Sequence, residues 1–263
     1  MVKYATLSHD IKLNFGQGFY MLETILLSSL AGTVLPSWFW GRTHYNKKKT
    51  ELFYNIKIAQ SLGNASALRD HDTGAHNYRV AYMASIIGEE LKLRKRVLQA
   101  LMKGAFLHDI GKIGIPDKIL LKDGPLNDDE WKTMRLHTML GKELIEDMPW
   151  FDDALDIVMY HHEKYDGTGY PDGLKAQDIP QNARIFSIID VFDALMSDRP
   201  YKYSFSYDKA LKIMKDSSGT QFDPKILEIF FRFAPYFADI IKNSSMQDAK
   251  QKLEKKRKVI FGL

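Results

Sequence analysis

The helical spacing of apolar residues is the feature that most constrains what this chain can fold into. Apolar side chains recur every three to four residues in most segments, as at Val80, Met83, Ala84 and Ile87, and this period places them on one helix face. No segment combines polar–apolar alternation with the turns of a hairpin. The sequence therefore predicts an all-α fold.

Four further apolar stripes predict further helices. Asn127 followed by Glu130 is typical of a capping box that opens the second of them, and Asp223–Pro224 is typical of the cap and first residue of a final helix through Phe231. The stripes are Val97, Leu98, Leu101, Met102, Ala105; Trp131, Met134, Leu140, Leu144, Ile145; Ala154, Leu155, Val158, Met159; and Ile185, Ile188, Ile189, Phe192, Leu195.

Two segments interrupt this rhythm, Gly111–Pro125 and Asp166–Pro180. Both are rich in Gly, Pro and Asp, so they are predicted to be loops. One follows a His-Asp pair and the other a His-His pair. Loops held on a rigid scaffold often carry binding chemistry.

The length of 263 residues, with 45% hydrophobic and 27% charged residues, fits one sizeable globular core with room for a small second unit. We expect an N-terminal helical region over 1–60, a catalytic domain over 61–240 and a basic tail over 241–263. The first region carries no chemistry that can be named. A truncated sensory module, a dimerisation helix and a packed helical extension are the alternatives.

Two segments bear on membranes and nucleic acids. Phe19–Trp40 is the most apolar stretch, but it contains Glu23 and Pro36, which favours a buried or interfacial helix over a transmembrane anchor. No basic region and cleavage site of a signal peptide is present, so we expect a cytoplasmic protein. The net charge of +4 owes much to Lys250–Lys258, expected as a solvated helix end or frayed terminus rather than a membrane or nucleic-acid patch.

The chain has no cysteine, which excludes disulfides, thiolate zinc sites and a cysteine nucleophile. Any metal must be held by histidine and carboxylate. Although a lone histidine is more often a core or capping residue, five of the eight lie at or near the ends of helical stripes. These grouped residues suit a divalent metal; they are His76, His108, His137, His161 and His162.

Adjacent helical residues point about 100° apart, so neighbouring histidines serve two ions better than one. Asp109 could bridge two such ions with its two oxygens. Asp190 and Asp193 share one face of an apolar helix, where a metal or a basic partner such as Arg199 would offset the cost of burial. A solvent-facing Asp190 is the alternative.

Several motifs in order carry a family resemblance. HDIGKIGIP (108–116), HHEKYDGTGYPDGL (161–174) and RPYK (199–202) closely resemble the HD-GYP family of bacterial phosphodiesterases. DTGAHNYRV (72–80), IPQNARI (179–185), DVFDAL (190–195) and FDP (222–224) match as well. The resemblance covers roughly residues 62–235, and it implies an HD-type helical bundle.

The resemblance also implies an activity and a set of site residues. The family hydrolyses cyclic dinucleotides, chiefly cyclic di-GMP, with two or three metal ions. Lys112 matches the residue that contacts the scissile phosphate, and Arg199 and Lys202 match positions that hold the dinucleotide. Gly169, Tyr170 and Pro171 are the GYP signature, and Gly167 and Gly169 would allow close backbone approach. The implied metal ligands are His76, His108, Asp109, His137, His161, His162 and Asp190.

One position departs from the family's three-metal pattern. Asp72 stands where those members have Glu, and its shorter side chain puts a third ion in doubt. Two divalent ions are therefore expected, iron or manganese rather than zinc, while a third ion with Asp72 as its ligand stays an alternative. The product is left open between pGpG and GMP. A cyclic di-GMP or mixed cyclic GMP-AMP substrate, contact with a diguanylate cyclase or another signalling protein, and a homodimer are further expectations.

Two other functions compete with the phosphodiesterase. The first is a catalytically weak or silent cyclic-dinucleotide receptor that signals through protein contacts; lost metal ligands would mark it, and none is lost. The second is an HD-type nucleotidase, against which the GYP loop and RPYK argue.

Overall fold

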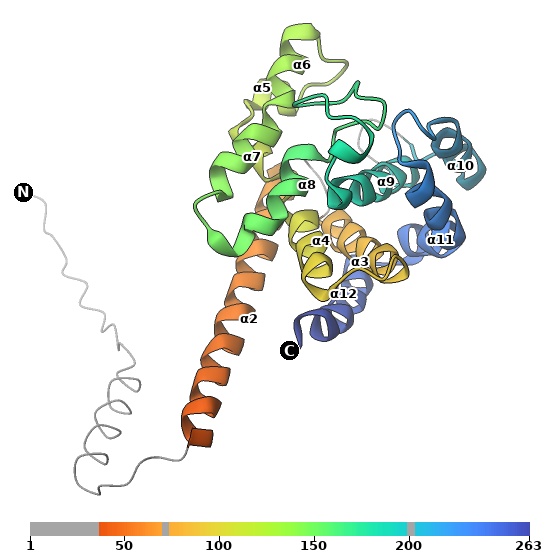
Figure 1. Ribbon diagram of the computed structural model, residues 1–263. Helices are drawn as coiled ribbons and strands as arrows, with labels where there is room; N and C mark the ends of the chain where they lie inside the picture. The colour runs from red at the N-terminus through yellow and green to blue at the C-terminus, as the bar shows by residue number, and fades with distance from the viewer. Residues whose placement is uncertain (1–36, 70–73, 199–202) are drawn as a thin grey trace, which may run out of the picture. The chain divides into compact units, whose positions relative to one another are not determined.

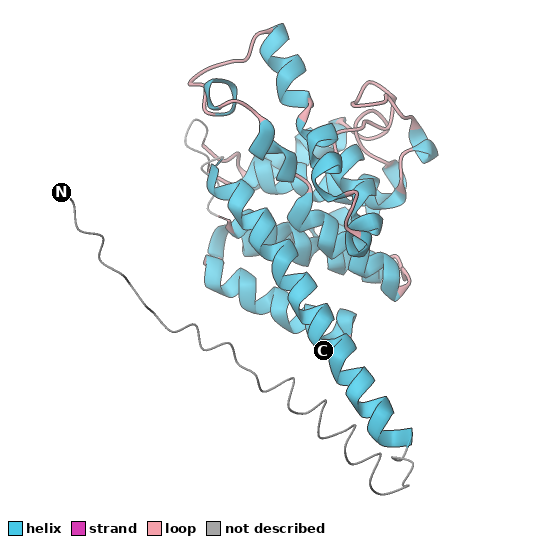
Figure 2. Ribbon diagram, turned by 90° about the vertical axis from the view of Figure 1, so that its left-hand side faces the viewer, coloured by secondary structure: helices cyan, strands magenta, loops and turns pink. Residues whose placement is uncertain are grey.

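The computed structural model describes residues 37–69, 74–198 and 203–263. Over these ranges the chain consists of helices, turns and loops without a strand (Figures 1 and 2), apart from an isolated bridge between Ser218 and Phe222. The predicted all-α fold is confirmed.

The helices, labelled as in Figure 1, include several short 3-10 segments labelled η. Their bounds are α2 (Ser37–Arg69), α3 (Ala75–Glu90), α4 (Lys95–Leu107), η1 (Ile110–Gly114), α5 (Asp117–Leu120), α6 (Asp128–Arg135), α7 (His137–Ile145), η2 (Pro149–Ala154), α8 (Leu155–Tyr160), η3 (Ala176–Asp178), α9 (Gln181–Met196), α10 (Tyr207–Asp216), α11 (Pro224–Asn243) and α12 (Met246–Phe261).

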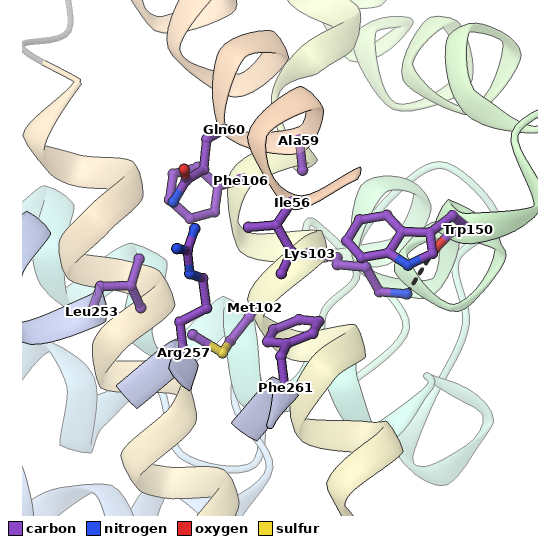
Figure 3. Close-up of a pocket in the computed structure, with 10 residues that line it drawn as sticks. All are labelled: Ile56, Ala59, Gln60, Met102, Lys103, Phe106, Trp150, Leu253, Arg257 and Phe261. Carbon is purple, nitrogen blue, oxygen red and sulfur yellow. Dashed lines mark hydrogen bonds between the residues drawn. The ribbon is translucent and has the colours of Figure 1, made fainter. Parts of the chain in front are cut away.

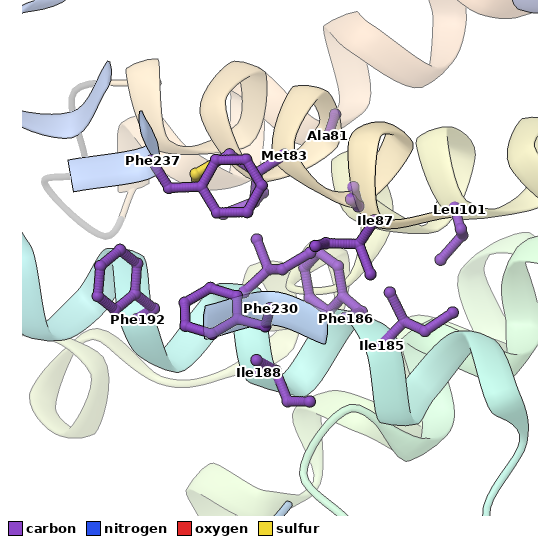
Figure 4. Packing of buried hydrophobic residues seen from close by; sticks show 14 of the residues in the cluster. Ala81, Met83, Ile87, Leu101, Ile185, Phe186, Ile188, Phe192, Phe230 and Phe237 are labelled. Atoms are coloured by element: carbon purple, nitrogen blue, oxygen red, sulfur yellow. The ribbon is translucent and has the colours of Figure 1, made fainter. Parts of the chain in front are cut away.

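Helix α3 is the hub of the core, because α4, α9, α11 and α12 all pack against it. Its predicted stripe is confirmed, since Val80, Met83, Ala84 and Ile87 are each at most 1% exposed. Figure 4 shows Met83 and Ile87 of this stripe beside aromatic and aliphatic side chains of α9 and α11. Burial on this scale provides the main drive for folding and fixes the ends of α3, α4 and α9.

The chain divides into two compact units, residues 1–51 and 52–263. In the first unit, only the part of α2 from Ser37 onward lies within the described residues. Most of the apolar stretch Phe19–Trp40 therefore lies outside them. Among the helices that the structure describes, none is long and apolar enough to cross a membrane.

The helix after Asn127 begins as predicted but does not continue as predicted. Asn127 and Glu130 form the capping box, whereas the single helix through Ile145 is wrong, because α6 ends at Arg135 and α7 starts at His137. The Leu136 N–H bonds the Thr133 carbonyl at 3.1 Å, and this tighter 3-10 turn separates the two helices. The break places His137 at the start of a new helix.

The C-terminal part is longer and more ordered than predicted. The side chain of Asp223 caps α11 as predicted, but the helix runs to Asn243, beyond Phe231. The basic segment, expected as a solvated helix end or frayed terminus, belongs to α12, which buries one face. The buried residues recur at helical spacing; they are Ala249, Leu253, Arg257, Ile260 and Phe261.

A small cavity lies where the second half of α2 meets α4, η2 and α12 (Figure 3). Arg257 lines it, is 6% exposed and pairs with Glu254 through Nη2. Its Nε and Nη1 are buried without a hydrogen-bond partner. None of the predicted site residues that the structure describes lines this cavity.

The two predicted loops contain short helical turns. Gly111–Pro125 includes most of η1 and the whole of α5, and Asp166–Pro180 includes η3. Pro116 precedes α5 with φ −60°, the value that the proline ring imposes. The turn residues therefore direct the chain into single helical turns rather than leaving it irregular.

Candidate metal centre

Helix ends bring the predicted ligands together. His76 lies in the first turn of α3, His108 directly follows α4, and His137 is the first residue of α7. His161 and His162 directly follow α8. Because the core fixes the positions of these helices, residues distant in sequence meet at one place.

The ligand atoms form two groups. In the first, atoms of Asp109, His137, His161 and His162 all lie within 4.8 Å of one another. In the second, the same holds for His76, His108 and Asp190. All seven residues that the family resemblance implied as metal ligands are therefore in these two groups.

Asp109 lies between the groups. Its Oδ2 is 3.1 Å from Nε2 of His108, and its Oδ1 is 3.5 Å from Nε2 of His137. Each oxygen thus faces a different group, as the bridging prediction requires. Oδ1 is also buried without a hydrogen-bond partner, which is costly for a carboxylate oxygen.

Backbone carbonyls fix the histidine rings. Nδ1 of His108 is 3.0 Å from the Ala105 carbonyl, Nδ1 of His137 is 2.8 Å from that of Met134, and Nδ1 of His161 is 2.9 Å from that of Ile157. A carbonyl only accepts, so the proton of each neutral ring lies on Nδ1. The Nε2 lone pair of each ring is then available as a ligand.

The electrostatics keep three of the rings neutral. Burial, reinforced by neighbouring histidines, holds the pKa of His161 well below its ordinary value and lowers that of His162 to about 3. Burial also lowers the pKa of His137. Neutral imidazole is the form that binds metal.

The carboxylates stay ionised. Burial alone would raise the pKa of Asp109, but the Lys112 ammonium and His108 hold it well below its usual range. For His76, burial lowers the pKa, but Asp193 and Asp190 outweigh burial and raise it to about 10. Negative charge therefore exceeds positive charge around His76, and a divalent cation could replace the proton there.

These observations fit a divalent metal. The donors are a buried carboxylate oxygen without a hydrogen-bond partner and several imidazole nitrogens that face it. The chain has no cysteine to supply a thiolate. This donor set suits iron, manganese or a similar ion.

Asp193 and Arg79 support His76 from behind. Nδ1 of His76 is 2.8 Å from Oδ2 of Asp193, while Nε of Arg79 donates to Oδ1 at 2.7 Å. The predicted shared face of Asp190 and Asp193 is confirmed, because both contact His76. The partner of Asp193 is Arg79 on α3, a residue that the sequence analysis did not identify.

The last turn of α2 holds the turn that carries Asp109. Ser66 Oγ donates to the Asp109 carbonyl at 2.7 Å. Arg69 donates to the carbonyls of Lys112 and Ile115, each at 2.8 Å, and to that of Ile113, and it pairs with Asp117. No sequence pattern pointed to Ser66 or Arg69.

Lys112 and the GYP segment lie beside the cluster. Lys112 Nζ is 2.9 Å from Asp109 Oδ2. The Tyr170 ring stacks on His162, with centroids 4.7 Å apart. A Cβ at Gly169 would lie 2.3 Å from the Lys164 nitrogen, so Gly169 is needed for packing within the loop itself.

Three predicted residues, Asp72, Arg199 and Lys202, lie outside the described residues. Their roles stay predictions. Arg135, whose guanidinium lies over the Tyr170 ring, was not predicted. Its position two residues before His137 is the signal that could have found it.

Comparisons with known proteins agree with this arrangement. The family model of the HD domain matches residues 60–226. The cyclic di-GMP phosphodiesterase response regulator RpfG of Xanthomonas campestris is 40% identical over 65% of this chain and 46% of its own length. A cyclic di-GMP phosphodiesterase of Thermotoga maritima is 34% identical over 73% of this chain and 53% of its own length.

A solved structure supports the fold. The cyclic GMP-AMP-specific phosphodiesterase V-cGAP3 of Vibrio cholerae has a TM-score of 0.56 at 19% identity, over 74% of this chain and 53% of that one. The chain spans about half the length of the curated relatives it matches. With the HD pair, the GYP segment and the ligand groups in place, the chain belongs to the HD domain family and to its HD-GYP branch.

Proposed function

We propose that this chain is a metal-dependent phosphodiesterase that hydrolyses a cyclic dinucleotide, with cyclic di-GMP as the principal substrate. The observation that carries this proposal is the convergence of histidine Nε2 atoms on the two oxygens of Asp109. Membership of the HD domain family implies divalent metal binding. The named activities of the relatives support the substrate class.

Two ions would occupy the two ligand groups. Asp109, His137, His161 and His162 would hold one ion, and His76, His108 and Asp190 would hold the other, with Asp109 shared. Iron or manganese suits these donors. We infer two ions rather than three, because Asp72 is one methylene shorter than the Glu of three-metal members.

When bound, the ions would activate a water molecule and offset charge on the phosphoryl oxygens. The net reaction adds one water across a P–O3′ bond and gives linear pGpG, which a second cleavage converts to GMP.

The protein's own residues orient the substrate and keep the site ready. Lys112, whose ammonium lies 2.9 Å from Asp109, would donate to an oxygen of the scissile phosphate, where a positive charge stabilises the transition state. Gly169, Tyr170 and Pro171 would bound the substrate site on one side. Arg199 and Lys202 would bind the remainder of the dinucleotide.

A catalytically weak receptor is the second candidate, but no observation favours it. All seven predicted ligands lie in the two groups, whereas a silent receptor has no need to retain a complete set.

The test is incubation of the full chain with Mn²⁺ or anaerobic Fe²⁺ and either cyclic di-GMP or mixed cyclic GMP-AMP, followed by chromatography of the products. We expect pGpG or GMP to appear from cyclic di-GMP in a metal-dependent manner, a linear GMP-AMP dinucleotide to form from cyclic GMP-AMP if it is also cleaved, and the Asp109→Ala variant to be inactive. Binding of cyclic di-GMP without turnover under all metal conditions would instead identify a receptor.

A further inference from the structure

Arg135 stands at the edge of the metal centre. It is in the last turn of α6, two residues before His137, and its side chain is exposed. Its guanidinium carbon lies 5.2 Å from the centroid of the Tyr170 ring. Tyr170 in turn stacks on His162. Arg135 is therefore connected to the ligand cluster both along the chain and through the aromatic ring.

The hydrogen-bond donors of Arg135 are not committed to a carboxylate. Arg69, Arg79 and Arg184 each have a carboxylate oxygen within 2.7 Å. Within the ranges that the structure describes, the Arg135 guanidinium has no such ion pair or hydrogen bond, and it lies over the Tyr170 ring. A ring contact restrains a guanidinium while leaving its five N–H donors able to bind a ligand.

The Arg135 guanidinium lies over the aromatic ring of Tyr170 rather than beside a carboxylate. A neutral aromatic face attracts a cation without neutralising it. Arg135 therefore presents a positive charge beside the cluster, next to the Tyr170 ring.

The proposed substrate has a second phosphate that such a charge can bind, alongside Arg199 and Lys202, which are proposed for the remainder of the dinucleotide. A cyclic dinucleotide carries two phosphates, and the metal groups with Lys112 neutralise only the one that is cleaved. We propose that Arg135 binds the second, non-scissile phosphate of the cyclic dinucleotide and thereby distinguishes this substrate from esters with a single phosphate. The guanidinium fork suits two phosphate oxygens at once. This inference rests on the proposed function.

The experiment compares two substrates across three variants of the full chain loaded with Mn²⁺. The substrates are cyclic di-GMP and bis(4-nitrophenyl) phosphate, which has one phosphate and no nucleoside. The variants are Arg135→Gln, Arg135→Lys and the matched control Lys132→Gln, which removes the same charge three residues earlier on the same helix, where Lys132 pairs with Asp129. The dissociation constant of a slowly hydrolysed phosphorothioate analogue of cyclic di-GMP is measured in parallel by calorimetry.

We expect Arg135→Gln to raise KM for cyclic di-GMP and the dissociation constant of the analogue by about tenfold, equivalent to about 1.4 kcal/mol, with kcat nearly unchanged. Arg135→Lys should show a smaller rise, because the charge remains while the fork is lost. Hydrolysis of bis(4-nitrophenyl) phosphate should be unchanged in all variants, and Lys132→Gln should match the wild type on both substrates.

Two results would overturn the proposal. The first is an unchanged dissociation constant in Arg135→Gln. The second is an equal loss on both substrates, which would mean that Arg135 acts on the metal centre through Tyr170 or His137. Failure of the proposed function looks different: the wild type would bind the analogue but not hydrolyse cyclic di-GMP, and the comparison of dissociation constants would still decide the role of Arg135.

Discussion

Replacing Asp193 by Asn tests whether the support behind His76 matters for metal binding. Asp193 is 1% exposed and accepts hydrogen bonds from Nε and Nη2 of Arg79 at 2.7 and 2.8 Å, while its Oδ2 lies 2.8 Å from His76 Nδ1. Asn has one acceptor oxygen, so its NH₂ group faces Arg79 Nε in one orientation and both Arg79 Nη2 and His76 Nδ1 in the other. The substitution therefore removes the negative charge opposite a buried guanidinium in either orientation, and it weakens the hold on the His76 ring.

The two consequences have separate magnitudes. Removing one partner of a buried ion pair costs about 3–5 kcal/mol, so the free energy of unfolding should fall by about 3 kcal/mol. Loss of the group that orients a metal-binding histidine costs about 10–100-fold in metal affinity. Urea unfolding followed by circular dichroism measures the first, and competition with a metal-sensitive dye measures the second.

Two controls separate stability from orientation. Asp216→Asn removes an exposed ion pair with Lys212 and should change stability by less than about 0.5 kcal/mol. The double variant Arg79→Met/Asp193→Leu removes both buried charges, so it should recover much of the lost stability but not the metal affinity. If Asp193→Asn loses stability yet binds metal within twofold of the wild type, Asp193 does not orient His76.

Three further predictions concern the site and the packing. Asp109→Ala should abolish turnover and lower the metal content measured by elemental analysis, while far-ultraviolet circular dichroism stays helical; near-normal hydrolysis with metal bound would refute the bridging role. Gly111→Ala should lower the free energy of unfolding by about 1–3 kcal/mol or more, because its Cβ would lie 1.9 Å from the His137 carbonyl oxygen and 2.4 Å from the Gly141 nitrogen; unchanged urea unfolding would contradict this. Arg257→Met should leave stability unchanged or raise it by about 1 kcal/mol, because it removes two buried unpaired donors; a clear fall in the melting temperature would show that these donors are satisfied.

The parts of the site that sequence could predict are those that chemistry restricts. Without cysteine, a metal must be held by histidine and carboxylate, and His108–Asp109 and His161–His162 stand out as adjacent pairs. Periodicity also predicted the buried stripe of α3, because a helix in a core needs an apolar face.

The supporting interactions could not be predicted, because tertiary packing selects the partners. Arg79 and Asp193 are 114 residues apart, and Arg199 was the basic partner named from the sequence for a buried Asp on this helix. The break at Leu136 was not predicted either, because the apolar stripe continues through it.

The contacts of α2 suggest how the site is held in register. Asp109 and Lys112 lie on one short 3-10 turn, which by itself has few hydrogen bonds to fix it. Ser66 and Arg69 bind four of the carbonyls of this turn and its continuation, those of Asp109, Lys112, Ile113 and Ile115. Since carbonyls at the end of a helical turn carry partial negative charge, the Arg69 guanidinium both satisfies and stabilises them. A shift of the last turn of α2 would therefore displace the Asp109 carboxylate and the Lys112 ammonium together, so the geometry of the metal centre depends on the position of a helix that contributes no ligand to either group.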